Sequence, residues 1–173
     1  MKLAALVVMA AFGVKAGTVT ACVHDKAGVP PPVRYKAQAL ASQMLATAGV
    51  RIEWRCPQDA DAIVIELNAD TPERVHPGAL AYALAFQATR IFIYYDRVRQ
   101  VADAELTPFL LGHVLVHEIT HVLQRCDEHS TSGVMKARWN PQDYARMQEK
   151  PLPFTPEDLS LIQSGLLARR GHP

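Results

Sequence analysis

Two histidines and a glutamate form the pattern in this sequence that could most directly do chemistry. Residues 117–121 read His-Glu-Ile-Thr-His. On a helix, this spacing places the imidazoles of His117 and His121 on one face, one turn apart, where they can share a metal ion. Glu118 lies about 100° round the helix from His117, so it can accept a proton from a water beside the ion. The alternative is a hydrogen-bonded polar stripe on a core helix, and the residues that follow argue against it.

A catalytic zinc ion normally has three protein ligands and an open fourth position for water, so two histidines leave the site incomplete. The candidates for the third ligand are His113, Asp127 and His129. Three ligands along one straight helix would span roughly 12 Å, so packing explains His113 better than ligation does. Asp127 and His129 follow the helix on a loop that can fold back. We predict His129 as the third ligand, with Asp127 as the alternative, or as an acceptor that holds an imidazole N–H.

The residues after the helix resemble a known family. Ser130 follows the last histidine, and residues 132–135 read Ser-Gly-Val-Met. This stretch resembles the metzincin clan of zinc endopeptidases, whose helix carries HExxHxxGxxH and whose chain then turns beneath the metal at a methionine. It also resembles small secreted bacterial proteins with a stretched form of the motif. Only residues 117–139 carry specific matches, although the order of elements over residues 18–168 is similar to the clan's. The resemblance implies a zinc ion bound by three histidines, a glutamate as general base, and hydrolysis of peptide bonds.

The sequence departs from the clan's pattern in the connection after the helix. Gln124 stands where the clan has glycine, and the spacing from His121 to His129 is two residues longer than the clan's. Glycine suits a tight turn because it adopts a positive φ without strain. A longer connection can turn without it, so the two departures explain each other, and in the unstretched spacing Asp127 would be the third ligand. Ala137 stands where some members have a tyrosine that assists the transition state.

The remaining chain predicts a mixed sheet with helices around it. A helix with apolar residues at helical spacing from Ala37 to Ala48 is closed by Gly49. The strand-like segments, of which the fourth alternates alanine with larger residues, are 19–23, 50–55, 61–68, 79–86 and 90–96. Three later helices each begin with a side-chain oxygen at the N-cap and a proline after it: Thr107-Pro108, Asn140-Pro141 and Thr155-Pro156. This order predicts one α+β domain over residues 17–173. The resemblance makes it zincin/metzincin-like, with a mixed twisted sheet, an active-site helix and C-terminal helices.

Residues 1–16 predict a secretory signal peptide, with a basic start, an apolar run and small residues at its end. The apolar run is too short to span a bilayer of roughly 30 Å, and a buried N-terminal segment is the alternative. Export to the periplasm or the medium would permit a disulfide. Cys22 and Cys56 adjoin two strand-like segments and are the expected pair, whereas Cys126 lies in the metal-site loop. Three separate thiols remain the alternative.

The composition is that of an ordinary globular domain, with 173 residues of which 49% are hydrophobic and 20% charged. Lys+Arg number 18 against 17 for Asp+Glu, so no basic surplus attracts nucleic acid. We expect a secreted or periplasmic monomer that hydrolyses a peptide or protein substrate, without nucleic acid and without a stable membrane span. Zn²⁺ would be bound by His117, His121 and His129, with Glu118 as general base, and the substrate would pair along residues 79–86. The alternatives are a secreted zinc-binding module without turnover and a zinc hydrolase of a non-peptide amide.

Overall fold

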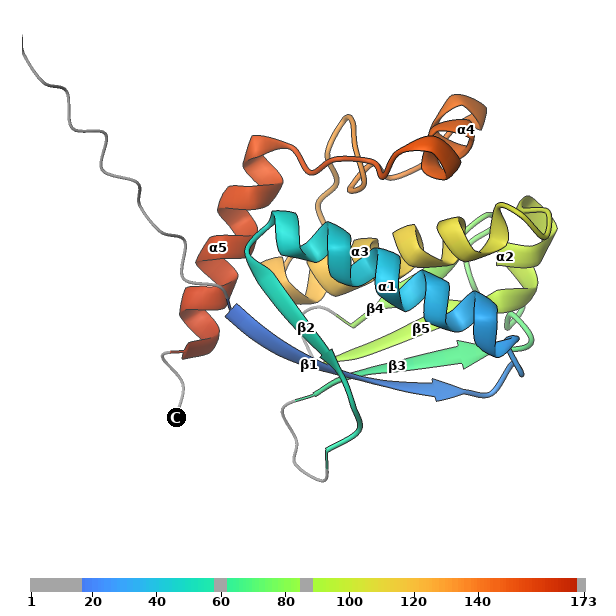
Figure 1. Ribbon diagram of the computed structural model, residues 1–173, viewed down its shortest axis with the longest axis horizontal. Helices are drawn as coiled ribbons and strands as arrows, with labels where there is room; N and C mark the ends of the chain where they lie inside the picture. Colours follow the sequence, from blue (N-terminus) through green and yellow to red (C-terminus); the bar gives the residue numbers. More distant parts are fainter. Residues whose placement is uncertain (1–16, 58–61, 85–88, 171–173) are drawn as a thin grey trace, which may run out of the picture.

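A computed structural model describes residues 17–57, 62–84 and 89–170, which form a sheet with helices packed on it (Figure 1). The predicted signal peptide, residues 1–16, lies outside the described residues. The strands are β1 (Gly17–Asp25), β2 (Val50–Trp54), β3 (Ile63–Asn68), β4 (Ala81–Ala83) and β5 (Arg90–Tyr94). Their order in the sheet is β2-β1-β3-β5-β4; β4 is antiparallel to β5, and the other neighbours are parallel. The predicted α+β class with a mixed sheet is confirmed.

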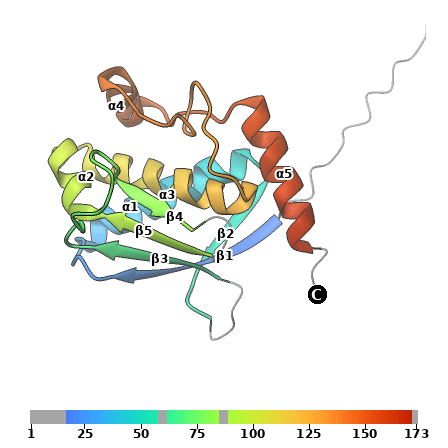
Figure 2. The same ribbon diagram turned by 180° about the vertical axis from the view of Figure 1, so that it is seen from behind.

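The helices are α1 (Pro31–Thr47), α2 (Tyr95–Val101), α3 (Thr107–Gln124), α4 (Pro141–Glu149) and α5 (Pro156–Arg170). Helices α1 and α3 lie side by side over the same face of the sheet, and α5 packs against α3 near the start of β1 (Figure 1, Figure 2). Strand residues that face these helices are fully buried, among them Ala21, Ile65 and Ile93. Helix α3 is therefore the centre of the molecule, and nearly every one of its side chains is buried.

The close contact between α1 and α3 depends on a small residue. A Cβ atom added to Gly112 of α3 would lie 2.8 Å from the Leu40 side chain and 3.1 Å from the carbonyl oxygen of Ala37. The apolar positions that predicted α1 bury it against this surface, and Gly49, with φ of 73°, ends it as expected. These helices hold α3 rigidly, so side chains on its last turns have fixed positions.

Two of the three predicted helix N-caps, those at Asn140 and Thr155, are present in the structure. The side chain of Asn140 accepts a hydrogen bond from Asp143 N, and the Asp143 carboxylate accepts one from Asn140 N. Thr155 and Asp158 make the same reciprocal pair at the start of α5. Both helices thus begin where the sequence predicts.

The prediction of Thr107 as an N-cap is wrong. Thr107 is the first residue of α3, and its hydroxyl donates to the carbonyl oxygen of Asp103, while the Asp103 carboxylate accepts from Leu106 N at 2.8 Å. An aspartate four residues earlier therefore satisfies the first turn. The polar groups that close a helix can come from any nearby turn, so a local Thr-Pro pair was not decisive.

Two strand predictions need correction. The strand expected over 90–96 ends at Tyr94, because α2 begins at Tyr95. The strand expected over 79–86 is shorter, because β4 covers only Ala81–Ala83. Hydrogen bonds to β5 continue on either side of it, from Tyr94 N to Leu80 O and from Leu84 N to Arg90 O. Residues 85–88 lie outside the described residues.

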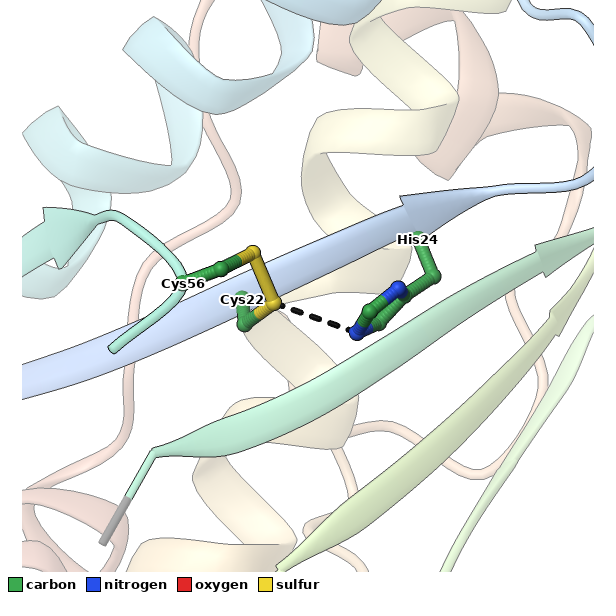
Figure 3. Close-up of side chains that lie close together, drawn as sticks. All are labelled: Cys22, His24 and Cys56. Atoms are coloured by element: carbon green, nitrogen blue, oxygen red, sulfur yellow. Dashed lines mark hydrogen bonds between the residues drawn. A yellow bond between two sulfur atoms is a disulfide. The ribbon is translucent and has the colours of Figure 1, made fainter. Parts of the chain in front are cut away.

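The predicted disulfide between Cys22 and Cys56 is present, with a Cα–Cα distance of 4.5 Å (Figure 3). It joins β1 to the segment after β2, and Cys126 is a free thiol. A disulfide is typical of proteins in oxidising compartments outside the cytoplasm. Within the described residues, none of the helices is both long and apolar enough to cross a bilayer.

Candidate metal centre

His117 and His121 lie on adjacent turns of α3, as the spacing predicts. Their side chains are buried, and their Nε2 atoms face each other at 3.0 Å. On the opposite side of each ring, Nδ1 is hydrogen-bonded to a backbone carbonyl, that of Val134 at 2.9 Å for His117 and that of Cys126 at 3.0 Å for His121. A carbonyl oxygen only accepts, so each Nδ1 carries the proton.

This tautomer leaves two lone pairs pointing at each other. With both Nδ1 atoms donating, the neutral imidazoles have no proton between their Nε2 atoms. Burial lowers the pKa of His117 to about 3 and that of His121 to about 4, so a proton does not bridge them at neutral pH. A cation is the species that two such facing acceptors can bind.

His129 completes the cluster from the loop after α3. The metal-binding atoms of His117, His121 and His129 all lie within 4.8 Å of one another. The ring centroid of His129 is 5.2 Å from that of His117 and 4.8 Å from that of His121. This group of three imidazoles could therefore hold a metal ion.

The chain reverses after α3 at a residue that the sequence did not indicate. Arg125 adopts a left-handed conformation with φ of 55°, and its N–H donates to His121 O at 2.9 Å. The connection turns without glycine, as expected, and Arg125 adopts the positive φ instead. The stretched loop places the left-handed residue one position beyond Gln124, where an arginine adopts it.

The other two candidates for the third ligand lie outside the group of three imidazoles. His113 is fully buried, its Nδ1 donates to Phe109 O at 2.7 Å, and its Nε2 accepts from Leu152 N at 3.1 Å. Both nitrogens are thus used inside the protein, and His113 packs as expected. The exposed carboxylate of Asp127 lies in the same cleft as the cluster and acts on it through its charge, which raises the pKa of both His121 and His129 against the effect of burial.

The segment expected to turn at a methionine, residues 132–135, lies next to the cluster and contacts one of its histidines. Gly133 has φ of 76°, and an added Cβ would lie 2.2 Å from Pro153 O, so only glycine fits there. Met135 is fully buried, and its carbonyl oxygen accepts from Ser130 N at 2.9 Å. The carbonyl oxygen of Val134, between these residues, is the one that orients His117.

Glu118 sits beside the histidines in an apolar setting. Its side chain is buried, and this burial raises the pKa of the carboxyl to about 8. The residue lines the same cleft as His117, His121 and His129. A carboxyl whose pKa lies near the working pH can both accept and return a proton, which suits a general acid and base.

The cleft over the cluster has a volume of about 560 Å³. Residues 77–83, which include β4, line it together with residues 136–139 and Tyr144 of α4. The ring of Trp139 packs edge-on against His117, with centroids 5.6 Å apart. No local spacing predicts Trp139 or Tyr144 at the site, because only the fold brings α4 and the residues just before it next to the cluster.

Tyr144 brings a phenol into the cleft that the resemblance would have placed at residue 137. The side chain is half-buried, and burial raises the pKa of its hydroxyl, which therefore remains protonated and able to donate. Position 137 itself is an exposed alanine that lines the same cleft.

Arg97 of α2 fixes the wall of the cleft opposite α4. Its Nη1 donates to the carbonyl oxygens of His76 and Ala79, each at 2.7 Å. Thr71 is tied to the same helix through two hydrogen bonds to Asp96. Helix α2, which the sequence did not predict, thus holds the segment that leads into β4.

The chain matches no protein-family model, and none of the curated proteins is similar to it in sequence. The likeness to metzincins therefore rests on residues 117–139 and on the histidine group described above.

Proposed function

We propose that this protein is a zinc-dependent peptidase that acts outside the cytoplasm. The observation that carries the proposal is the convergence of His117, His121 and His129 within 4.8 Å, next to Glu118 in an open cleft. Three imidazoles with a carboxylate beside them are a donor set typical of catalytic zinc. The disulfide between Cys22 and Cys56 is consistent with an extracytoplasmic protein.

The three histidines would hold the ion through their free nitrogens, since the Nδ1 atoms of His117 and His121 already donate to carbonyl oxygens. The chemistry that zinc supplies at such a site is the activation of water and the polarisation of a carbonyl. Glu118 would accept a proton from the attacking water as its oxygen bonds to the scissile carbon. The same carboxyl would then deliver that proton to the leaving amine nitrogen as the C–N bond breaks.

The substrate would lie along β4. This strand is at the end of the sheet, and its pairing with β5 uses one of its edges. The other edge can pair with an extended peptide by main-chain hydrogen bonds. Ala81 and Ala83 line the cleft with short side chains, so a peptide backbone can approach closely.

The experiment that tests this proposal compares the wild type with Glu118→Gln on a broad peptide library. We expect Glu118→Gln to retain zinc, measured by elemental analysis, and to lose hydrolysis by at least ~100-fold, because the amide cannot accept the proton. Loss of metal together with activity would make Glu118 a ligand and would contradict the mechanism.

A zinc-binding module without turnover is the second candidate, and the alanine at position 137 favours it. In that case the wild type would bind zinc and cleave no peptide in the library. Cleavage of simple amides but not of peptides would instead indicate the third candidate, a hydrolase of a non-peptide amide.

A further inference from the structure

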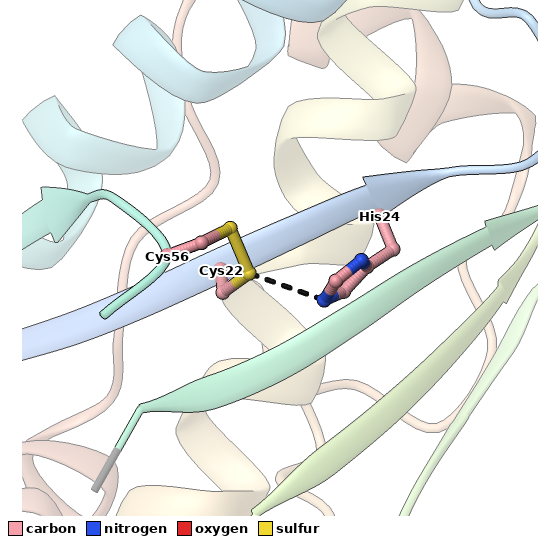
Figure 4. The surroundings of a disulfide bond; sticks show 3 residues. All are labelled: Cys22, His24 and Cys56. Atoms are coloured by element: carbon pink, nitrogen blue, oxygen red, sulfur yellow. Dashed lines mark hydrogen bonds between the residues drawn. A yellow bond between two sulfur atoms is a disulfide. The ribbon is translucent and has the colours of Figure 1, made fainter. Parts of the chain in front are cut away.

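A second group of metal-binding side chains lies far from the α3 histidines in the sequence, on β1 and the segment after β2. The sulfur atoms of Cys22 and Cys56 and a nitrogen of His24 lie within 4.8 Å of one another. Figure 4 shows His24 reaching along β1 toward the disulfide, with its Nε2 3.2 Å from Cys22 Sγ. His24 and Cys56 are exposed, whereas Cys22 is buried.

The sheet brings these residues together independently of the disulfide. Cys22 and His24 are two residues apart on β1, so their side chains share one face of the sheet. Strand β2 runs parallel to β1 with Ala21 opposite Trp54, and Arg55 N donates to Ala21 O at 3.0 Å. The next residue is Cys56. Hydrogen bonds from β1 to β2 and to β3 hold this arrangement, so it does not require the S–S bond.

We propose that Cys22, Cys56 and His24 form a redox-gated binding site for a thiophilic cation such as Zn²⁺. In the dithiol form, two cysteine sulfurs and one imidazole nitrogen bind the ion and leave one coordination position open. In the disulfide form, both sulfurs are consumed and the site is closed. The disulfide and the ion therefore exclude each other, and this site does not depend on the proposed peptidase activity.

Opening the site requires a dithiol reductant. One thiolate of the reductant attacks the exposed Cys56 sulfur, the S–S bond breaks, and its electron pair goes to Cys22. That sulfur, which lies 3.2 Å from Nε2 of His24, takes up a proton from solvent. The second thiol of the reductant then loses its proton and attacks the reductant's other sulfur in the mixed disulfide, and Cys56 leaves and takes up a proton. The reductant leaves as a disulfide, two electrons have passed to the protein, and binding of the ion displaces the two thiol protons.

The experiment uses the full chain carrying Cys126→Ser, which removes the free thiol. Metal-free protein is prepared in the disulfide form and, after anaerobic reduction by a dithiol and its removal, in the dithiol form. Both forms are titrated with Co²⁺, because thiolate-to-cobalt charge transfer gives a near-ultraviolet band that three imidazoles cannot produce. We expect this band in the dithiol form alone, with the dithiol form binding one more equivalent of Co²⁺ than the disulfide form, and we expect the band to disappear when Zn²⁺ is added.

His24→Ala in the same background tests the third ligand. We expect it to weaken Co²⁺ binding by at least ~10-fold, while His76→Ala, which removes another exposed imidazole, leaves the affinity unchanged. Circular dichroism of the dithiol form reports whether the fold is kept. The proposal is overturned if the dithiol form gives no charge-transfer band, if His24→Ala binds as tightly as its parent, or if reduction unfolds the domain.

Discussion

The two ends of helix α3 carry buried histidines in opposite chemical situations. His113, in its first half, donates through Nδ1 to Phe109 O and accepts through Nε2 from Leu152 N. His117 and His121, one and two turns later, each use Nδ1 in the same way, but their Nε2 atoms face each other. Buried polar groups are nearly always satisfied by the protein itself. A pair of acceptors left to face each other therefore marks a place built for something that the protein does not supply.

The difference arises from what covers each end of the helix. The backbone at Leu152, ahead of α5, closes over His113 and supplies its second partner. Over His117 and His121 the chain leaves a cleft, bounded by residues 77–83 and 136–139. The same residue type on the same helix is structural where the chain closes over it and available for binding where the chain does not.

The sharpest way to break this comparison is to remove one imidazole from each end. We expect His121→Ala to lower zinc affinity by ~100-fold or more. Mutation of a residue that only supports a ligand already weakens metal binding, so loss of a ligand should weaken it at least as much. His113→Phe keeps the ring volume and should leave zinc affinity unchanged, although it destabilises the fold. Competition with a chromophoric chelator measures both affinities. Equal losses of affinity would show that the two ends do not differ.

The features that the sequence predicted correctly depend on regular local spacing. The HExxH pattern, the capping pairs at Asn140 and Thr155, and the glycine at the end of α1 each involve residues within five positions of one another. The disulfide was predictable because each cysteine adjoins a strand-like segment. For these features, the spacing along the chain is enough to specify the geometry.

The features that the sequence did not predict depend on distant partners. Helix α2 begins directly at the end of β5, and its role appears only when Arg97 reaches the carbonyl oxygens of the segment before β4. Tyr144 lines the cleft because α4 packs against α3, and its place relative to Met135 follows no local spacing. The left-handed conformation at residue 125 was not predictable because an arginine, and not a glycine, adopts it. Each of these depends on tertiary packing that one sequence does not encode in a recognisable motif.

The pH dependence of stability sharpens the comparison at the closed end of α3. His113 has a pKa lowered to about 4 by burial, against 6.5 when unfolded. Its neutral form is therefore favoured in the fold, and this contribution is fully present above pH 6.5 and is lost as the pH falls toward 4. The difference corresponds to up to about 3 kcal/mol. Protonation would place a second N–H against Leu152 N, which already donates.

The measurement is the free energy of unfolding of metal-free protein by urea between pH 7 and pH 4. We expect His113→Phe to be less stable than the wild type at pH 7 but to lose less stability on acidification. If the two proteins lose stability in parallel, His113 does not titrate as its burial implies.

Alanine substitutions at two glycines test whether the turn at residue 133, next to the cluster, is rigid. Gly133 and Gly28 both have a positive φ, of 76° and 65°, so alanine at either should cost about 1 kcal/mol from backbone strain. A Cβ at Gly28 meets nothing within 4 Å, whereas one at Gly133 would lie 2.2 Å from Pro153 O. We expect Gly133→Ala to be less stable than Gly28→Ala by a further ~1–3 kcal/mol.

Because the neighbouring Val134 O orients His117, Gly133→Ala should also weaken zinc binding, and Gly28→Ala should not. Chemical denaturation and the chelator competition provide the two readouts. Equal stability of the two variants would mean that the chain at residue 133 moves aside without cost.

The smallest expected effect concerns Asp127, which lies at the open end of α3 beside His129. Burial lowers the pKa of both His121 and His129, and the negative charge of Asp127 offsets part of this lowering, so it favours a cation in the cluster without joining the three imidazoles. We expect Asp127→Asn to weaken zinc binding by about tenfold, in the range of residues that support ligands, and His129→Ala to weaken it considerably more. The asparagine keeps the size and polarity of the side chain, so the change isolates the charge. If instead Asp127→Asn weakens zinc binding more than His129→Ala does, then the carboxylate is the third ligand. The loop would then adopt the unstretched spacing on binding zinc, with His129 displaced from the cluster.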